Sequence, residues 1–185
     1  STAFLFVAVF LKLNPETFYS LLAAGYWLIV FSILLVIVVY DIRHKIIPDG
    51  FVWSFVFLSF ILLFKNIWTS NTQIFELFSG PLLAFPFFML WLVSRGRWMG
   101  LGDAKLVLGI GWFLGFSSGI AAVTISFWAG AIFGIFLLAV KKLFSNVKHL
   151  TIKSEISFAP FLALGMLLVF LFGLDFYDLQ LFFTF

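Results

Sequence analysis

Cysteine is absent from this chain of 185 residues, so it can form neither a disulfide framework nor a thiolate zinc site. Charged residues are also scarce, at 10%, while hydrophobic residues reach 64%. Soluble domains are roughly a quarter charged and about half apolar. A soluble globule of this length cannot bury so much Phe, Leu and Ile. The composition therefore excludes a soluble enzyme and indicates a polytopic membrane protein whose first partner is the lipid bilayer.

The scarcity of histidine and of clustered charge excludes further classes of function. The two histidines, His44 and His149, lie in basic loops where we expect solvation, and no His, Cys and carboxylate cluster has the spacing of a metal site. No metal and no cofactor is therefore expected. The net charge is only +3 and the basic residues are scattered among short loops, which argues against a nucleic-acid partner. Ser1 leads directly into apolar residues without a basic n-region. We therefore expect one membrane-embedded domain over 1–185, truncated at its N-terminus.

Apolar runs predict the fold class. They cover roughly 2–13, 19–41, 51–68, 74–94, 104–116, 118–140 and 156–174. About 20 helical residues span the hydrocarbon core. The second, fourth, sixth and seventh runs reach that length, the third nearly does, and the fifth is too short to cross without a dipped start. Because only helices satisfy their own backbone in lipid, the prediction is an all-α, polytopic membrane bundle of about six to seven transmembrane or re-entrant helices. The tail at 175–183 is expected in the outer interface.

The basic residues predict the orientation. Only Lys12 and Lys65 fall on one side of this topology, and the other nine of the eleven fall on the opposite side: Arg43, Lys45, Arg95, Arg97, Lys105, Lys141, Lys142, Lys148 and Lys153. The positive-inside rule makes the richer side cytoplasmic. Seven crossings then place Ser1 inside and Phe185 outside. Three glycine pairs, at 111/115, 115/119 and 130/134, predict close helix crossings.

Two aspartates stand where apolar runs meet this basic side. Asp41 closes Ile37-Val38-Val39-Tyr40-Asp41, and Asp103 closes Gly100-Leu101-Gly102-Asp103. An ionisable residue at the edge of hydrocarbon is costly and therefore indicates a functional site. Each also has a structural interpretation. Asp103 and Asp49 can cap the helices that follow them, and Asp41 can pair with Arg43, Lys45 or Lys105.

Three stretches together resemble the bacterial type IV prepilin peptidases. They are Tyr40-Asp41-Ile42-Arg43-His44-Lys45-Ile46-Ile47-Pro48-Asp49, Gly100-Leu101-Gly102-Asp103-Ala104-Lys105-Leu106, and Ser157-Phe158-Ala159-Pro160-Phe161-Leu162-Ala163-Leu164-Gly165. The resemblance implies an aspartic endopeptidase of the inner (plasma) membrane with Asp41 and Asp103 as its catalytic pair. It implies supporting roles for Pro48, Asp49, Gly100, Gly102, Lys105 and Pro160. The substrate implied is a prepilin or pseudopilin with a basic leader, cut after glycine at the cytoplasmic face.

The chemistry of such a pair follows from its charge. Two carboxyl groups in one site cannot both ionise cheaply, so one keeps a proton while the other activates water. We interpret the glycines before Asp103 as leaving room for the substrate backbone. Many relatives also carry an N-terminal CxxC region associated with methylation, and its absence here puts methyltransferase activity and S-adenosylmethionine in doubt.

Three alternatives remain from the sequence. Presenilin-type proteases share the Tyr-Asp and Gly-Leu-Gly-Asp motifs, although the Ile-Pro-Asp and Asp-Ala-Lys-Leu contexts favour the prepilin branch. A small proton-coupled transporter also places carboxylates in membrane helices. A structural membrane subunit would use Asp41 and Asp103 only as ion-pair and cap residues.

Overall fold

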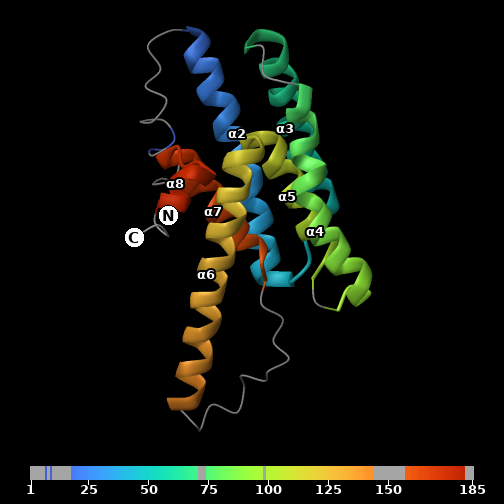
Figure 1. Cartoon of the computed structure of the whole chain (residues 1–185), viewed down its shortest axis with the longest axis vertical. Helices are drawn as coiled ribbons and strands as arrows, with labels where there is room; N and C mark the ends of the chain where they lie inside the picture. The colour runs from blue at the N-terminus through green and yellow to red at the C-terminus, as the bar shows by residue number, and fades with distance from the viewer. Residues whose placement is uncertain are drawn as a thin grey trace.

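A computed structural model describes residues 7, 9, 18–70, 74–97, 99–143 and 157–181, and these residues form a helical bundle (Figure 1). The predicted all-α membrane fold is confirmed over this part of the chain. In order, the elements are α2 (Phe18–His44), α3 (Asp49–Ser70), the 3₁₀ helix η1 (Ile74–Phe78), α4 (Ser79–Ser94), α5 (Leu101–Leu114), α6 (Phe116–Leu143), α7 (Ala159–Phe172) and α8 (Phe176–Leu181). The predicted run at 2–13 lies almost wholly outside the described residues.

Four helical stretches are long and apolar enough to cross a membrane: Leu22–His44, Asp49–Thr69, Phe75–Ser94 and Phe116–Leu137. They correspond to the predicted runs at 19–41, 51–68, 74–94 and 118–140. The third run is therefore longer than predicted. The prediction that the seventh run is long enough to span is wrong, because α7 has only 14 residues. Pro160 stands at its start, and Gly173, with a φ of 64°, ends it in a left-handed conformation.

The short helix α5 is the central element of the bundle. It packs against α3, α4, α6 and α7, while α2 packs against α3 and α7 (Figure 1). Leu106, Val107 and Ile110 on α5 have no exposed surface. A 14-residue helix is about 21 Å long, shorter than a hydrocarbon core of about 30 Å. Both ends of α5 therefore need partners from neighbouring elements.

Backbone groups at the turn between α5 and α6 form hydrogen bonds with side chains of η1 and α4. The hydroxyl of Ser79 donates to the Gly111 carbonyl at 2.9 Å, and the Phe116 N–H donates to Glu76 Oε2 at 3.1 Å. Gly115, with a φ of 84°, makes the reversal. Unsatisfied backbone groups in a bilayer cost several kcal/mol each. These bonds hold the C-terminal end of α5 in place while its N-terminal end carries Asp103.

The predicted glycine crossings hold at some positions only. A Cβ built on Gly111 would lie 2.7 Å from the Cα of Gly80, so α4 and α5 approach backbone to backbone there. Gly119 lies tightly against Leu83 of α4. At Gly130 the nearest atom is at an ordinary 3.5 Å, and at Gly134 nothing lies within 4 Å. The pair Gly130 and Gly134 therefore does not form the predicted close crossing, because no neighbouring element among the described residues packs tightly against α6 at either position.

The contrast between Gly111 and Gly134 gives a stability prediction. Gly111→Ala should lower the free energy of unfolding by about 1–3 kcal/mol, since its nearest contact is backbone that cannot swing aside. Gly134→Ala makes no such contact and should not lower the free energy of unfolding, because Ala is the better helix former. Denaturant or thermal unfolding of the two variants in the same detergent measures the difference. Equal destabilisation by both changes would contradict the α4–α5 crossing.

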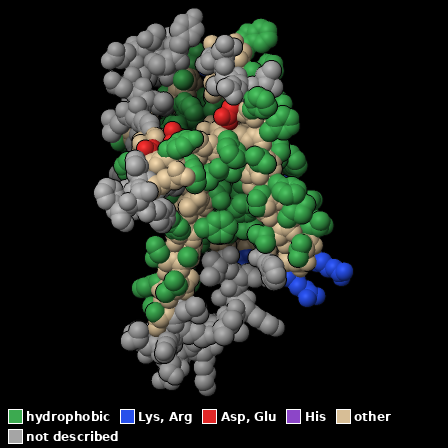
Figure 2. Space-filling model, viewed as in Figure 1, with side chains coloured by type: hydrophobic (Ala, Val, Ile, Leu, Met, Phe, Trp, Pro, Cys, Tyr) green, Lys and Arg blue, Asp and Glu red, His purple; other side chains and the backbone are tan. Residues whose placement is uncertain are grey.

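The two ends of the bundle carry different charged side chains. Arg95 and Arg97 follow α4, and Figure 2 shows basic side chains gathered at the lower end of the face it displays. Arg43 and Lys45 belong to the same end, where α2 finishes. At the far end, Asp175 before α8 accepts a hydrogen bond from Ser118 of α6. Among the described residues, these four basic side chains therefore lie at one end of the bundle, as the sequence predicts for them.

Candidate active site

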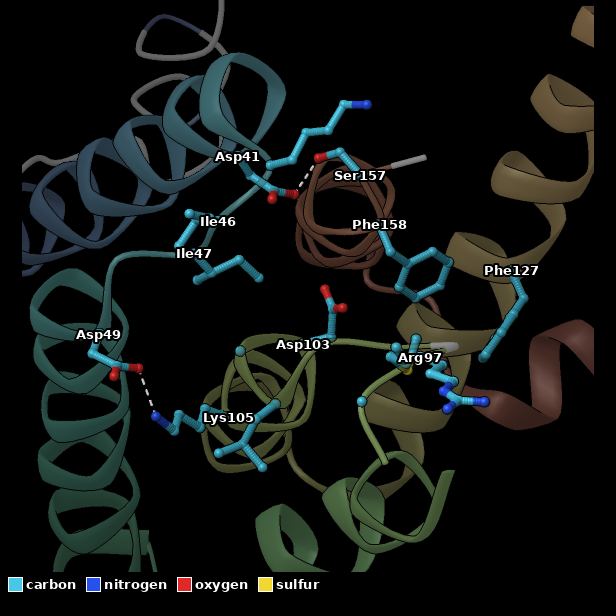
Figure 3. Close-up of a pocket in the computed structure, with 16 residues that line it drawn as sticks. Asp41, Ile46, Ile47, Asp49, Arg97, Asp103, Lys105, Phe127, Ser157 and Phe158 are labelled. Atoms are coloured by element: carbon cyan, nitrogen blue, oxygen red, sulfur yellow. Dashed lines mark hydrogen bonds and ion pairs between the residues drawn. The ribbon is translucent and has the colours of Figure 1, made fainter. Parts of the chain in front are cut away.

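A pocket of about 550 Å³ lies at the basic end of the bundle, where α2 and α4 finish and α3, α5 and α7 begin (Figure 3). Both predicted catalytic aspartates line it, although 62 positions separate Asp41 from Asp103 in the sequence. Helix order explains the meeting, because successive antiparallel helices bring every second connection to the same end. The other lining residues are Lys45, Ile46, Ile47, Asp49, Gly96, Arg97, Met99, Gly100, Leu101, Gly102, Lys105, Phe127, Ser157 and Phe158.

Asp41 is buried near the end of α2, with 5% of its surface exposed. The helix continues to His44, and the Lys45 N–H donates to the Asp41 carbonyl at 2.7 Å. Its carboxyl oxygen Oδ2 accepts a hydrogen bond from the hydroxyl of Ser157. Sequence reasoning offered only basic partners for Asp41 and did not single out Ser157. The available signal was a lone hydroxyl in an otherwise apolar stretch that leads into Pro160.

Asp103 is the third residue of α5 and is 7% exposed. Gly100, with extended φ and ψ of −74° and 148°, occupies the N-cap position, so the prediction that Asp103 is the cap is wrong. Leu101 and Gly102 are already helical, which carries Asp103 into the first turn, where the helix dipole still favours an acidic group. Within the described residues its Oδ1 is buried without a hydrogen-bond partner. Figure 3 shows this carboxyl group directed into the space beside Asp41 and Ser157.

Gly102 has a packing role that differs from the sequence interpretation. A Cβ at this position would lie 2.7 Å from the Cβ of Ile47, in the loop between α2 and α3. The room beside Gly102 is therefore filled by this chain, and it is not space left for a substrate backbone. At Gly100 the nearest atom to such a Cβ is Asp103 Oδ2 at 3.7 Å, so the original interpretation remains compatible with Gly100. Ile47 thus fixes how closely the start of α5 approaches the loop between α2 and α3.

Asp49 and Lys105 connect the starts of α3 and α5. Lys105 Nζ lies 2.6 Å from Asp49 Oδ1 and 5.6 Å from the ring centroid of Trp53. The Val52 N–H donates to the Pro48 carbonyl, so Pro48 is the N-cap and the predicted capping role of Asp49 is wrong. Asp49 is the first helical residue instead. The Asp49 side chain is 68% exposed, and pairs of that kind contribute at most about 1 kcal/mol, so the pair aligns two helices more than it stabilises them.

Pro160 and an aromatic group complete the pocket. Pro160 stands in the first turn of α7, where proline costs no helix bond, and thereby fixes the start of the helix that follows Ser157 and Phe158. The ring centroids of Phe127 on α6 and Phe158 are 5.1 Å apart, and those of Phe127 and Phe87 on α4 are 5.8 Å apart. Phe127 lines the pocket and is 45% exposed, so the aromatic wall continues from the pocket to the outer surface. Sequence reasoning did not identify Phe127 or Arg97 as lining residues.

The described residues contain no group of three or more His, Cys, Asp or Glu that could hold a metal ion. The pocket itself offers two buried carboxyl groups, one hydroxyl and the basic residues at its rim. Paired carboxyl groups of that kind can exchange protons with a water and a carbonyl between them.

A family model places the chain among known proteins. The model of the type IV leader peptidase family matches residues 28–135, which is more than half of the chain and includes Asp41, Asp49 and Asp103. Searches of curated proteins and of solved structures give no match. The sequence resemblance predicted this family, and two of the three stretches that carried it, 40–49 and 100–106, lie within the matched residues. The chain therefore belongs to the type IV leader peptidase family and is a membrane peptidase.

Proposed function

We propose that this chain is an aspartic endopeptidase in which Asp41 and Asp103 form the catalytic pair. The observation that carries the proposal is that both carboxyl groups, 5% and 7% exposed, line one pocket although they come from different helices. Buried carboxyl groups are costly unless their position serves a purpose. A purely structural role accounts poorly for Asp103, because its buried Oδ1 has no partner among the described residues.

The mechanism follows from the shared site. One carboxylate takes a proton from a water while the protonated partner donates to the oxygen of the scissile carbonyl. The water oxygen bonds to the carbonyl carbon, and a tetrahedral intermediate forms. When the C–N bond breaks, the leaving nitrogen takes the proton that the carboxylate received. The hydroxyl proton returns to the other aspartate, which restores the pair.

We propose a prepilin-like or pseudopilin-like substrate, with a basic leader followed by an apolar helix and a cut after glycine. The family supports this substrate class, and the pocket fits it in two respects. It lies at the basic end of the bundle, which by the positive-inside rule is the end that we propose faces the cytoplasm in an inner (plasma) membrane. Its aromatic wall, Phe127 with Phe158, is continuous with the apolar outer surface, so a substrate helix can remain in lipid while its start reaches the aspartates.

A direct cleavage assay tests the proposal. The purified chain, in detergent and then in liposomes, is incubated with a peptide that joins a basic leader, a glycine and an apolar helix. Mass mapping should find one cut, after the glycine, and the same peptide with the glycine replaced by a bulky residue should stay largely intact. Absence of cleavage, together with proton flux through the liposomes that depends on Asp41 and Asp103, would support the transporter alternative instead.

A further inference from the structure

The two aspartates of the pocket have unequal surroundings. Asp41 Oδ2 accepts a hydrogen bond from Ser157, which immediately precedes α7. Asp103 Oδ1 is buried and has no hydrogen-bond partner among the described residues. Both side chains are nearly fully buried, so exposure to water does not explain the difference. The donor at Asp41 is one hydroxyl group that lies 116 positions away in the sequence. In the part of the chain that the structure describes, the Asp103 carboxyl group has only the neighbouring backbone of Gly100 beside it as a donor, and its Oδ1 has none.

A hydroxyl hydrogen bond has a direction that matters here. Ser157 can donate its proton to a carboxylate, and a hydrogen bond to a charged acceptor is roughly twice as strong as one between neutral groups. A buried oxygen without a donor is a poor place for negative charge, because nothing replaces the lost water. The helix dipoles act in the opposite sense, because Asp103 lies at the start of α5 and Asp41 near the end of α2, but this effect is weaker than a hydrogen bond to a charged group. Between two carboxyl groups that share one proton, the charge is therefore better accommodated on Asp41 and the proton on Asp103.

We propose that Ser157 is a positioning residue that assigns the roles within the pair: it holds Asp41 as the carboxylate that takes the proton from water, and it leaves Asp103 as the acid that protonates the scissile carbonyl. This inference rests on the proposed function. It adds that the start of α7 is part of the catalytic arrangement. It also gives Pro160 a purpose, since that proline fixes the turn of helix three residues after Ser157.

The geometry around Ser157 supports a positioning role over a packing role. Ser157 is half-buried and lines the pocket beside Phe158, whose ring packs on Phe127 and Phe87. These aromatic contacts hold the segment in place without the hydroxyl. Removing the hydroxyl alone should therefore leave the fold intact and change only the hydrogen bond to Asp41.

The test compares Ser157→Ala, Ser157→Thr and a matched control, Ser59→Ala. Ser59 is a fully buried serine on α3 whose hydroxyl donates to the Phe55 carbonyl within its own helix. Ser157→Ala should lower kcat for peptide cleavage by about 10- to 100-fold, the effect of losing a hydrogen bond to a charged group, while KM changes little. Ser157→Thr keeps the hydroxyl and should recover most of the rate. Ser59→Ala should cleave at the wild-type rate.

The outcomes separate this inference from the proposed function. If the wild-type chain cleaves and the aspartate variants do not, but Ser157→Ala keeps its kcat or only raises KM, the positioning role is overturned alone. Failure of Ser157→Thr to recover the rate, with unfolding temperatures equal to wild type, also overturns it. A loss as complete as that of Asp41→Asn would make Ser157 a reacting group and overturn it as well. Absence of cleavage by the wild-type chain removes both proposals together.

Discussion

Asp41→Asn and Asp103→Asn should each abolish peptide cleavage while the bundle remains folded. An amide is similar in size to a carboxyl group but can neither hold nor exchange the shared proton. Removing one member of a hydrolase catalytic unit costs on the order of 10⁴- to 10⁶-fold in kcat, so each single variant should fall to the background rate. Mass mapping of the peptide after long incubation measures the residual rate, and thermal unfolding in detergent checks the fold.

The double variant and a remote acidic residue supply the controls. Because the two groups act as a unit, the double variant should be little worse than either single one. Asp178→Asn changes a carboxyl group in α8, far from the pocket in sequence and fold, and should leave the rate unchanged. Cleavage at a near wild-type rate by either Asp41→Asn or Asp103→Asn would remove the pair from catalysis and restore the structural interpretation of both aspartates.

Much of this fold can be predicted from the sequence because lipid imposes strong rules. Long apolar runs in a membrane can only be helices, so α2, α3, α4 and α6 follow directly from the runs at 19–41, 51–68, 74–94 and 118–140. Run length does not show where the backbone stops being helical. The run at 156–174 is continuous in hydropathy, yet α7 occupies only Ala159–Phe172 within it. Hydropathy also does not show that the short fifth run, which forms α5, is the central helix.

The candidate site was predicted in part, for a similar reason. Asp41 and Asp103 stand out because ionisable groups are rare in this chain, and the motifs around them are specific. Ser157 and Ile47 do not stand out, because serine and isoleucine are both common in this sequence. Their roles depend on contacts between segments distant in the sequence, Ser157 with Asp41 and Ile47 with Gly102. The capping predictions failed by one and three residues, at Asp49 and Asp103, because helix starts are set by local backbone geometry that composition does not fix.

Gly102→Ala should lower the rate of peptide cleavage by about 10- to 100-fold. The new Cβ would lie 2.7 Å from Ile47 Cβ and 3.0 Å from its Cδ1, and neither Cβ can move without its backbone. The start of α5 must shift to relieve the contact, and Asp103 is the next residue. Overpacking of this kind costs about 1–3 kcal/mol, and a misplacement of about 1 Å at a catalytic group can cost on the order of 10²-fold in rate.

A compensating change makes this prediction specific. Ile47→Gly removes all three of the atoms nearest to the new Cβ, so the double variant Gly102→Ala with Ile47→Gly should recover most of the rate that Gly102→Ala loses. Gly100→Ala places its Cβ no closer than 3.7 Å to another atom and should show a smaller loss than Gly102→Ala. Kinetic measurement of the three variants, with unfolding temperatures as the check on folding, decides between two explanations of the glycine motif. If both glycines instead leave room for the substrate backbone, Gly100→Ala and Gly102→Ala should lose activity alike, and Ile47→Gly should restore nothing, because the obstruction would lie between enzyme and substrate.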